Sequence, residues 1–206
     1  MPLRQQIQKV SADLDAQGLL RYLITEKFPG DIVVTASLRA SSIVVLKMVA
    51  DIDPATPVIF CQRPPVFEES AQFREQITQL LGLENTSMND GHEPQTRADD
   101  RDHCEDMWVS YLNRPGQTYE ILHLNDCLAP YKCWVSGVYH VPPVSSIVPR
   151  VDSDGQIIKI DPLARWTKER VHRFMKEHNL PYHKLAKRTF EYEDRGDSQI
   201  APTYPF

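Results

Sequence analysis

The feature that most constrains the fold is an alternation of strand-like and helix-like apolar segments. Residues 32–35, inside "DIVVTASLRASSIVVLKMVADI", form a short, mostly apolar run that indicates a buried strand. Residues 41–51 follow with the pattern of a helix, and residues 56–61, "TPVIFC", indicate a second strand. A second helical pattern covers residues 67–81. Strands and helices that alternate in this way predict a parallel sheet with right-handed crossovers.

Further elements complete an α/β domain. The sequence predicts a helix over 4–27 that "FPGD" at 28–31 ends, a strand within 132–141, and a helix over 168–178 that Thr167 caps. Apolar runs on either side of Asp154-Gly155 are typical of a β-hairpin. Residues 89–106 are polar without periodicity and indicate a long surface loop. We therefore expect a single α/β domain over 1–206, with a Rossmann-like, mostly parallel sheet and one antiparallel hairpin.

The segment between the first strand and its helix has the composition of an anion-binding loop. A strand that runs into a helix N-terminus presents backbone N–H groups, and the helix dipole adds to their attraction for anions. Ser37, Ser41 and Ser42 add hydroxyl donors, and Arg39 adds a positive charge. Phosphate loops usually contain glycine, and this segment has none. The pattern alone therefore leaves two interpretations open, a binding loop or an ordinary strand-to-helix turn capped by serine.

Charge and apolar content indicate which ligands and which location the protein has. The net charge of -5 disfavours nucleic acid as the main ligand. No apolar run is long enough to span a membrane. The first residues, "MPLRQQIQKVSADLDAQ", lack the apolar core of a signal peptide, which favours a cytoplasmic protein.

Cysteine and histidine positions give no metal-site signature. The four cysteines, Cys61, Cys104, Cys127 and Cys133, contain no CxxC pair, so we expect reduced thiols. The spacing in "DHCED" at 102–106 matches no ligand pattern, and no metal is predicted. His172 and His178 are expected to face solvent. His183 is expected either to be structural or to lie near the pocket.

Longer segments of the chain resemble a known family. "AQGLLRYLITEKFPGDIVVTASLRASSIVVLKMVADIDPATPVIF" resembles the sulfonucleotide reductases, which act on adenylyl sulfate or its 3′-phosphorylated form. "SLRASS" stands where the wider PP-loop superfamily has SGGxDS, and "FEES" at 67–70 stands where the reductases have FPET. Residues 159–185 and "RGDSQIAPT" at 195–203 are similar to the family's last helix and its GD loop. The resemblance implies a sheet of the adenine nucleotide alpha-hydrolase type.

The resemblance also implies a binding site for an adenine sulfonucleotide or a related anionic nucleotide. The anionic end would meet the serine loop, the adenine would lie near the second strand, and further residues would close over the ligand. The expected binding residues are Ser37, Arg39, Ser41, Ser42, Arg63, Lys187, Arg188, Gly196, Asp197 and Ser198. Ser41 stands at the motif's acidic position, which argues for a sulfonucleotide rather than ATP with Mg²⁺. No bound cofactor is expected, and an iron–sulfur cluster is not expected because the Cys-Cys pair and later CxxC are missing.

The catalytic thiol is the main departure from the family. The reductases carry their nucleophilic cysteine in a C-terminal ECG-type tail, whereas this sequence has no cysteine beyond Cys133. Cys133 begins an apolar strand and is expected to be buried. Cys61 ends the second strand near the proposed pocket. Cys127 lies in a predicted loop, although Asp126 beside it would raise its pKa. Cys61 and Cys127 are therefore the two candidate nucleophiles.

Three functions remain open at this level. The chain could be a divergent phosphoadenylyl-sulfate reductase that releases sulfite with thioredoxin or another thiol donor. It could instead be an adenylyl or sulfur transferase on the same fold. A third alternative is a non-catalytic nucleotide-binding or scaffold protein. A homodimer is compatible with the sequence, which does not determine the oligomeric state.

Overall fold

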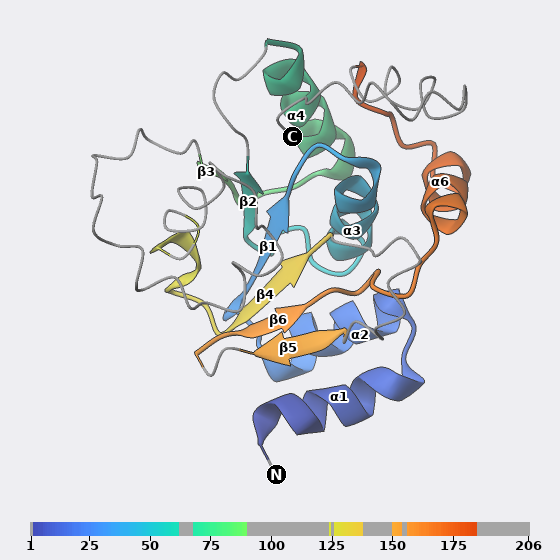
Figure 1. Ribbon diagram of the computed structural model, residues 1–206. Coiled ribbons are helices and arrows are strands. Elements are labelled where there is room, and N and C mark those ends of the chain that lie inside the picture. The colour runs from blue at the N-terminus through green and yellow to red at the C-terminus, as the bar shows by residue number, and fades with distance from the viewer. Residues whose placement is uncertain are drawn as a thin grey trace, which may run out of the picture.

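A mostly parallel sheet of six strands forms the centre of the computed structural model, which describes residues 2–61, 68–89, 124, 126–137, 150–153 and 156–184 (Figure 1). The strands are β1 (Ile32–Ala36), β2 (Val58–Cys61), β3 (Thr86–Asn89), β4 (Cys133–Ser136), β5 (Val151–Ser153) and β6 (Ile158–Ile160). Their order is β3-β2-β1-β4-β6-β5, and only β5 and β6 pair in antiparallel fashion. This arrangement confirms the predicted α/β class and the antiparallel pair, while the expected turn at 154–155 lies outside the described residues.

Six helical elements with defined bounds lie around the sheet, besides a short helical segment at 126–128. They are α1 (Leu3–Asp13), α2 (Ala16–Tyr22), the π-helical turn η1 (Leu23–Lys27), α3 (Ala40–Ala50), α4 (Glu68–Leu81) and α6 (Lys168–Glu177). The prediction of one continuous helix over 4–27 was wrong. Leu14 has an extended backbone, and the Asp15 side chain caps α2 by accepting a hydrogen bond from the Gly18 N–H at 2.7 Å. Thr167 caps α6 as predicted.

The first face of the sheet packs on helices and is apolar. Side chains alternate between the two faces of a strand. Ile32, Val34 and Ala36 of β1 consequently share the main core with residues of α1, α2, α3, α4 and α6. Cys133 also lies in this core and is fully buried, as the sequence predicted. Burial raises the pKa of the Cys133 thiol far above its usual value, which makes this cysteine a structural residue.

The second face carries a smaller apolar cluster beside buried polar side chains. The cluster consists of Val33, Ile59, Leu128, Trp134 and Ile157. Thr35, Ser136, Lys159 and Asp161 are also buried and occupy the same alternate positions of β1, β4 and the end of β6. This face is therefore the polar one.

Two parts of the fold were not visible in the sequence. The edge strand β3 was missed because Met88 is its only apolar residue and none of its four residues is fully buried, so the segment carries no apolar pattern. Arg150 is buried, and its guanidinium donates hydrogen bonds to the carbonyls of Ser11, Leu14 and Asp15, which ties β5 to the corner between α1 and α2.

The histidines around α6 differ partly from expectation. His178 is exposed, as predicted. His172 is half-buried instead, since its Nδ1 lies 2.8 Å from the Tyr182 hydroxyl and the two rings stack. His183 is buried against α4, where its Nε2 lies 3.1 Å from the Ser70 hydroxyl and its ring meets the edge of Phe73.

Candidate functional site

The carboxyl ends of the parallel strands define one edge of the sheet. β2 and β3 lie on one side of β1, whereas β4 and β6 lie on the other. The chain adds β2 and β3 on one side of β1 and then crosses over to add β4 on the other side. The switch point of the sheet therefore lies between β1 and β4. In open α/β sheets, ligands bind outside the carboxyl ends of the strands at such a switch point. The segment that follows β1 at this point is the Ser37–Ser42 loop.

The Ser37–Ser42 loop is closed by two serine contacts. The Ser37 N–H donates to the Ser42 hydroxyl at 3.3 Å, and the two hydroxyl oxygens lie 3.1 Å apart. The N-cap residue of α3 is Arg39, which makes no side-chain capping hydrogen bond. A serine therefore does not occupy the N-cap position of α3, and the serine contact within the turn is the one between Ser37 and Ser42.

The loop leads into a helix that lies deep in the protein. Eight of the eleven residues of α3 are buried, including Ser41 and Ser42 in its first turn. Arg39 is exposed just before this turn. The N–H groups of a first helical turn have no intrahelical partners, and the helix dipole concentrates positive potential there. The structure thus brings together four predicted residues, Ser37, Arg39, Ser41 and Ser42, around the start of one helix.

The end of β4 presses against this first turn. A Cβ atom placed on Gly137 would lie 2.7 Å from the Ser42 Cα and 2.8 Å from its Oγ, so only glycine allows the contact. One residue earlier, the Ser136 hydroxyl donates to an Asp161 carboxylate oxygen at 2.6 Å. Neither Ser136 nor Gly137 was predicted as a site residue. The signal was present in "WVSG", where two small residues follow a buried strand.

Only one of the two candidate thiols lies at this edge. Cys61 is the last residue of β2 and is half-buried, with its thiol 3.8 Å from the Ile59 carbonyl. Cys127 lies in a short helical segment at 126–128 rather than in the predicted loop. Shortly after it, the N–H groups of Lys132 and Cys133, at the start of β4, donate to the Asp31 carbonyl just before β1. Cys127 therefore lies toward the amino ends of the strands, away from the Ser37–Ser42 loop.

His183 lies near the same edge of the sheet and has a structural role there. It packs against the first turns of α4, which follows β2 in the chain. Burial lowers the pKa of His183, and the nearby Glu69 carboxylate opposes that shift only in part. The neutral ring therefore joins the segment after α6 to α4.

The remaining predictions concern further binding residues, a surface loop, a metal site and a membrane-spanning helix. The predicted binding residues Arg63, Lys187, Arg188, Gly196, Asp197 and Ser198 all lie outside the described residues. The predicted surface loop over 89–106 lies outside as well, apart from Asn89, which is the last residue of β3. Across the residues that the structure does describe, no group of three or more His, Cys, Asp or Glu side chains could hold a metal ion. In the same ranges, no helix has the length and apolar character needed to cross a membrane.

The strand order and the helices around it define an open, mostly parallel α/β sheet with a loop and a helix N-terminus at its switch point. The chain belongs to the phosphoadenosine phosphosulfate reductase domain family, whose model matches residues 31–192. This result confirms the resemblance on which the sequence analysis relied.

Individual relatives agree with the family assignment. An adenosine 5′-phosphosulfate reductase of Salinibacter ruber is 27% identical over 165 residues, which cover 77% of this chain and 63% of that protein. A reductase of the same name from a Chelativorans species is 27% identical over 186 residues, covering 87% of this chain and 75% of the relative. The crystal structure of a phosphoadenylyl-sulfate reductase from Candida auris, a phosphate complex, superposes with a TM-score of 0.66 at 17% identity. That match covers 96% of this chain and 93% of the other and shows a common fold.

Proposed function

We propose that this protein binds an adenine sulfonucleotide at the carboxyl edge of the sheet, with the anionic end of the ligand against the Ser37–Ser42 loop. The observation that carries the proposal is the position of this loop. It joins β1 to the buried helix α3 at the switch point of the sheet. Membership of the reductase family supports the choice of ligand.

Local rather than global charge would attract the anion. The protein as a whole carries a net charge of -5, which repels anions at long range. At short range the ligand would meet the N-terminus of an eleven-residue helix and the exposed guanidinium of Arg39. Ser37 and Ser42 bond to each other, so their hydroxyls shape the loop as well as offering donors.

The activity we infer is reduction of the sulfonucleotide to sulfite. A thiolate would attack the sulfur atom, forming an S–S bond while the bond from sulfur to the phosphate oxygen breaks and the nucleotide leaves with that electron pair. A dithiol such as that of thioredoxin would then release sulfite from the enzyme thiosulfonate and be oxidised to a disulfide. Within the described residues, Cys61 is the thiol at the binding edge and is our candidate nucleophile. No bound cofactor is needed for these steps.

Binding is tested by calorimetry with adenosine 3′,5′-bisphosphate. We expect wild-type protein to bind, and Arg39→Ala to weaken binding by about tenfold, since hydrogen bonds to charged groups contribute on that order. Arg21→Ala is the matched control, because Arg21 is an exposed arginine in the last turn of α2. If the wild type bound no nucleotide, the proposed site would be wrong.

Catalysis is tested separately by thioredoxin-dependent release of sulfite from adenylyl sulfate and from its 3′-phosphorylated form. Cys61→Ser should abolish the release, whereas Cys127→Ser should preserve it. Nucleotide binding without sulfite release in the wild type would instead favour the non-catalytic alternative. Release that persists in Cys61→Ser would assign the thiol to another residue.

A further inference from the structure

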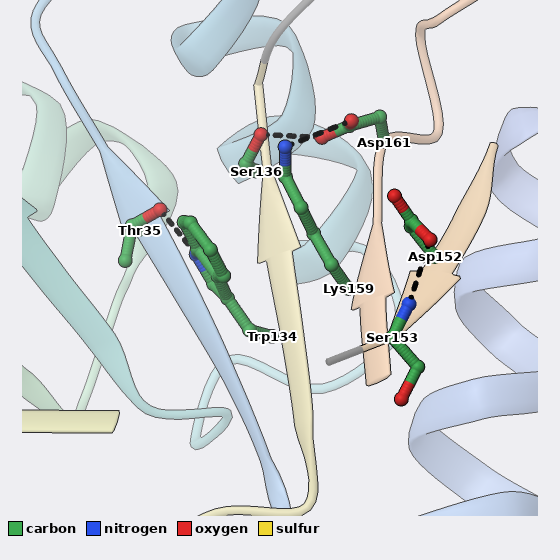
Figure 2. Close-up of polar contacts among 7 residues, drawn as sticks. All are labelled: Thr35, Trp134, Ser136, Asp152, Ser153, Lys159 and Asp161. Atoms are coloured by element: carbon green, nitrogen blue, oxygen red, sulfur yellow. Dashed lines mark hydrogen bonds and ion pairs between the residues drawn. The ribbon is translucent and has the colours of Figure 1, made fainter. Parts of the chain in front are cut away.

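A buried charge pair lies on the second face of the sheet, next to the edge that carries the candidate site (Figure 2). Lys159 belongs to β6 and Asp161 follows it, with only 6% and 5% of each residue exposed. The Lys159 ammonium lies 3.2 Å from one carboxylate oxygen of Asp161. A buried pair contributes little net stability over apolar replacements, so stability alone does not account for it.

The second carboxylate oxygen of Asp161 holds the end of β4. It accepts the Ser136 hydroxyl at 2.6 Å, and Ser136 is itself 4% exposed. Hydrogen bonds to an ionised acceptor are short and strong, and two contacts to one carboxylate leave it little freedom to rotate. The ammonium also lies 5.3 Å from the centre of the Trp134 ring, which constrains the lysine from a second side.

The residue after Ser136 connects the bond between Ser136 and Asp161 to the Ser37–Ser42 loop. Gly137 follows Ser136 and lies so close to the first turn of α3 that a Cβ would approach the Ser42 nitrogen to 3.0 Å. Ser42 in turn accepts the Ser37 N–H. The position of the end of β4 therefore sets the position of Ser42 and, through Ser42, the shape of the loop.

We propose that Lys159, Asp161 and Ser136 are positioning residues for the anion-binding loop. The lysine orients the carboxylate, the carboxylate holds Ser136, and Gly137 then supports Ser42 in the conformation that receives the anion. The inference rests on the proposed function, because it names what shapes the same site. None of the three side chains needs to touch the ligand.

The test compares two buried hydrogen bonds on the same face of β4. Ser136→Ala removes the bond to Asp161, and Ser136→Thr restores a hydroxyl. Trp134→Phe is the matched control, since it removes the 2.7 Å bond from the indole N–H to the Thr35 hydroxyl and keeps an aromatic ring beside Lys159. For each variant, the dissociation constant of adenosine 3′,5′-bisphosphate is measured by calorimetry and the melting temperature by circular dichroism.

We expect Ser136→Ala to raise the dissociation constant on the order of tenfold. The reason is that the substitution removes a charge-assisted hydrogen bond, whose loss would reach the ligand through the loop. Ser136→Thr should return it toward the wild-type value. Trp134→Phe should lower the melting temperature and leave the dissociation constant unchanged. Gly137→Ala gives an independent test, because it keeps the Ser136 bond but displaces Ser42, and it should weaken binding at least as much.

Two outcomes would overturn the inference without touching the proposed function. The first is wild-type affinity in Ser136→Ala and Gly137→Ala, and the second is an equal loss of affinity in the Trp134→Phe control. Absence of nucleotide binding in the wild type would overturn the proposed function and this inference together.

Discussion

The two faces of the sheet are built from different interactions. On the first face, alternating apolar side chains such as Ile32, Val34 and Val135 pack on helices and are at most 2% exposed. On the second face, a small apolar cluster adjoins directional contacts that involve Lys159 and Asp161. Apolar packing resists unfolding but allows small shifts, whereas hydrogen bonds between buried groups specify positions. The face with directional contacts is the one whose residues connect to the Ser37–Ser42 loop.

Breaking the charge pair on the second face should have the largest effect on stability. Asp161→Ala leaves the Lys159 ammonium buried without its carboxylate, and such losses cost about 3–5 kcal/mol of unfolding free energy. Urea unfolding followed by circular dichroism measures the change. Replacing both residues, with Lys159→Met and Asp161→Leu, should recover most of the loss because no unpaired charge remains. A single variant as stable as the wild type would contradict the pairing.

A cavity on the first face should cost slightly less. Leu20 of α2 is fully buried in the main core, so Leu20→Ala should lower the unfolding free energy by about 2–5 kcal/mol. The same urea experiment measures it. Leu80→Ala is the control, because Leu80 is 54% exposed on α4 and its truncation should change stability by no more than about 0.5 kcal/mol. Equal losses in the two variants would show that the core is not where the structure places it.

The sequence predicted the elements whose apolar pattern is local. The runs at β1 and α3, and those at β2 and α4, are bounded by turn residues, and both pairs formed as expected. β3 has no such pattern, because an edge strand with Met88 as its single apolar residue is held by backbone pairing with β2. The break between α1 and α2 depends on the Asp15 cap, a weak signal inside a longer helical pattern.

The candidate site also has one part that the local sequence predicts and another that depends on contacts between distant residues. The Ser37–Ser42 loop could be predicted because strand, serines and helix are adjacent in the sequence. Its support could not, since Ser136 and Asp161 lie 25 residues apart and meet only after β4 and β6 have paired. Nor does sequence spacing reveal that Gly137 touches Ser42, because that contact depends on the packing of α3 against β4.

Removing the indole donor on the second face should have an intermediate effect. Trp134→Phe leaves the Thr35 hydroxyl without the 2.7 Å bond it accepts, and an unmet buried polar group costs about 1–3 kcal/mol. Thermal unfolding of the variant measures the loss. The double variant with Thr35→Val removes both polar groups and should be more stable than Trp134→Phe alone. If the two were equally stable, the bond would contribute nothing.

Acidification should act through His183 with a smaller effect. Burial lowers the pKa of His183 in the folded state, so the unfolded chain binds the proton first as pH falls below the ordinary value near 6.5. Stability contributed by the neutral ring is therefore full above that pH and is lost as pH decreases toward the folded pKa. His183→Gln should flatten this dependence in unfolding measured between pH 7 and about 5. An unchanged slope in His183→Gln would contradict this role of the buried ring.

The smallest effect should come from a salt bridge that resembles the buried pair in chemistry but not in environment. Lys132 lies 2.6 Å from the Asp31 carboxylate, yet their side chains are 70% and 42% exposed. Water already solvates both charges, so Lys132→Ala should cost no more than about 1 kcal/mol, and less at high salt because surface pairs are screened. The backbone bond from the Lys132 N–H to the Asp31 carbonyl survives the substitution. Urea unfolding at low and high salt measures the difference; a loss comparable to that of Asp161→Ala would mean that burial is not what separates the two pairs.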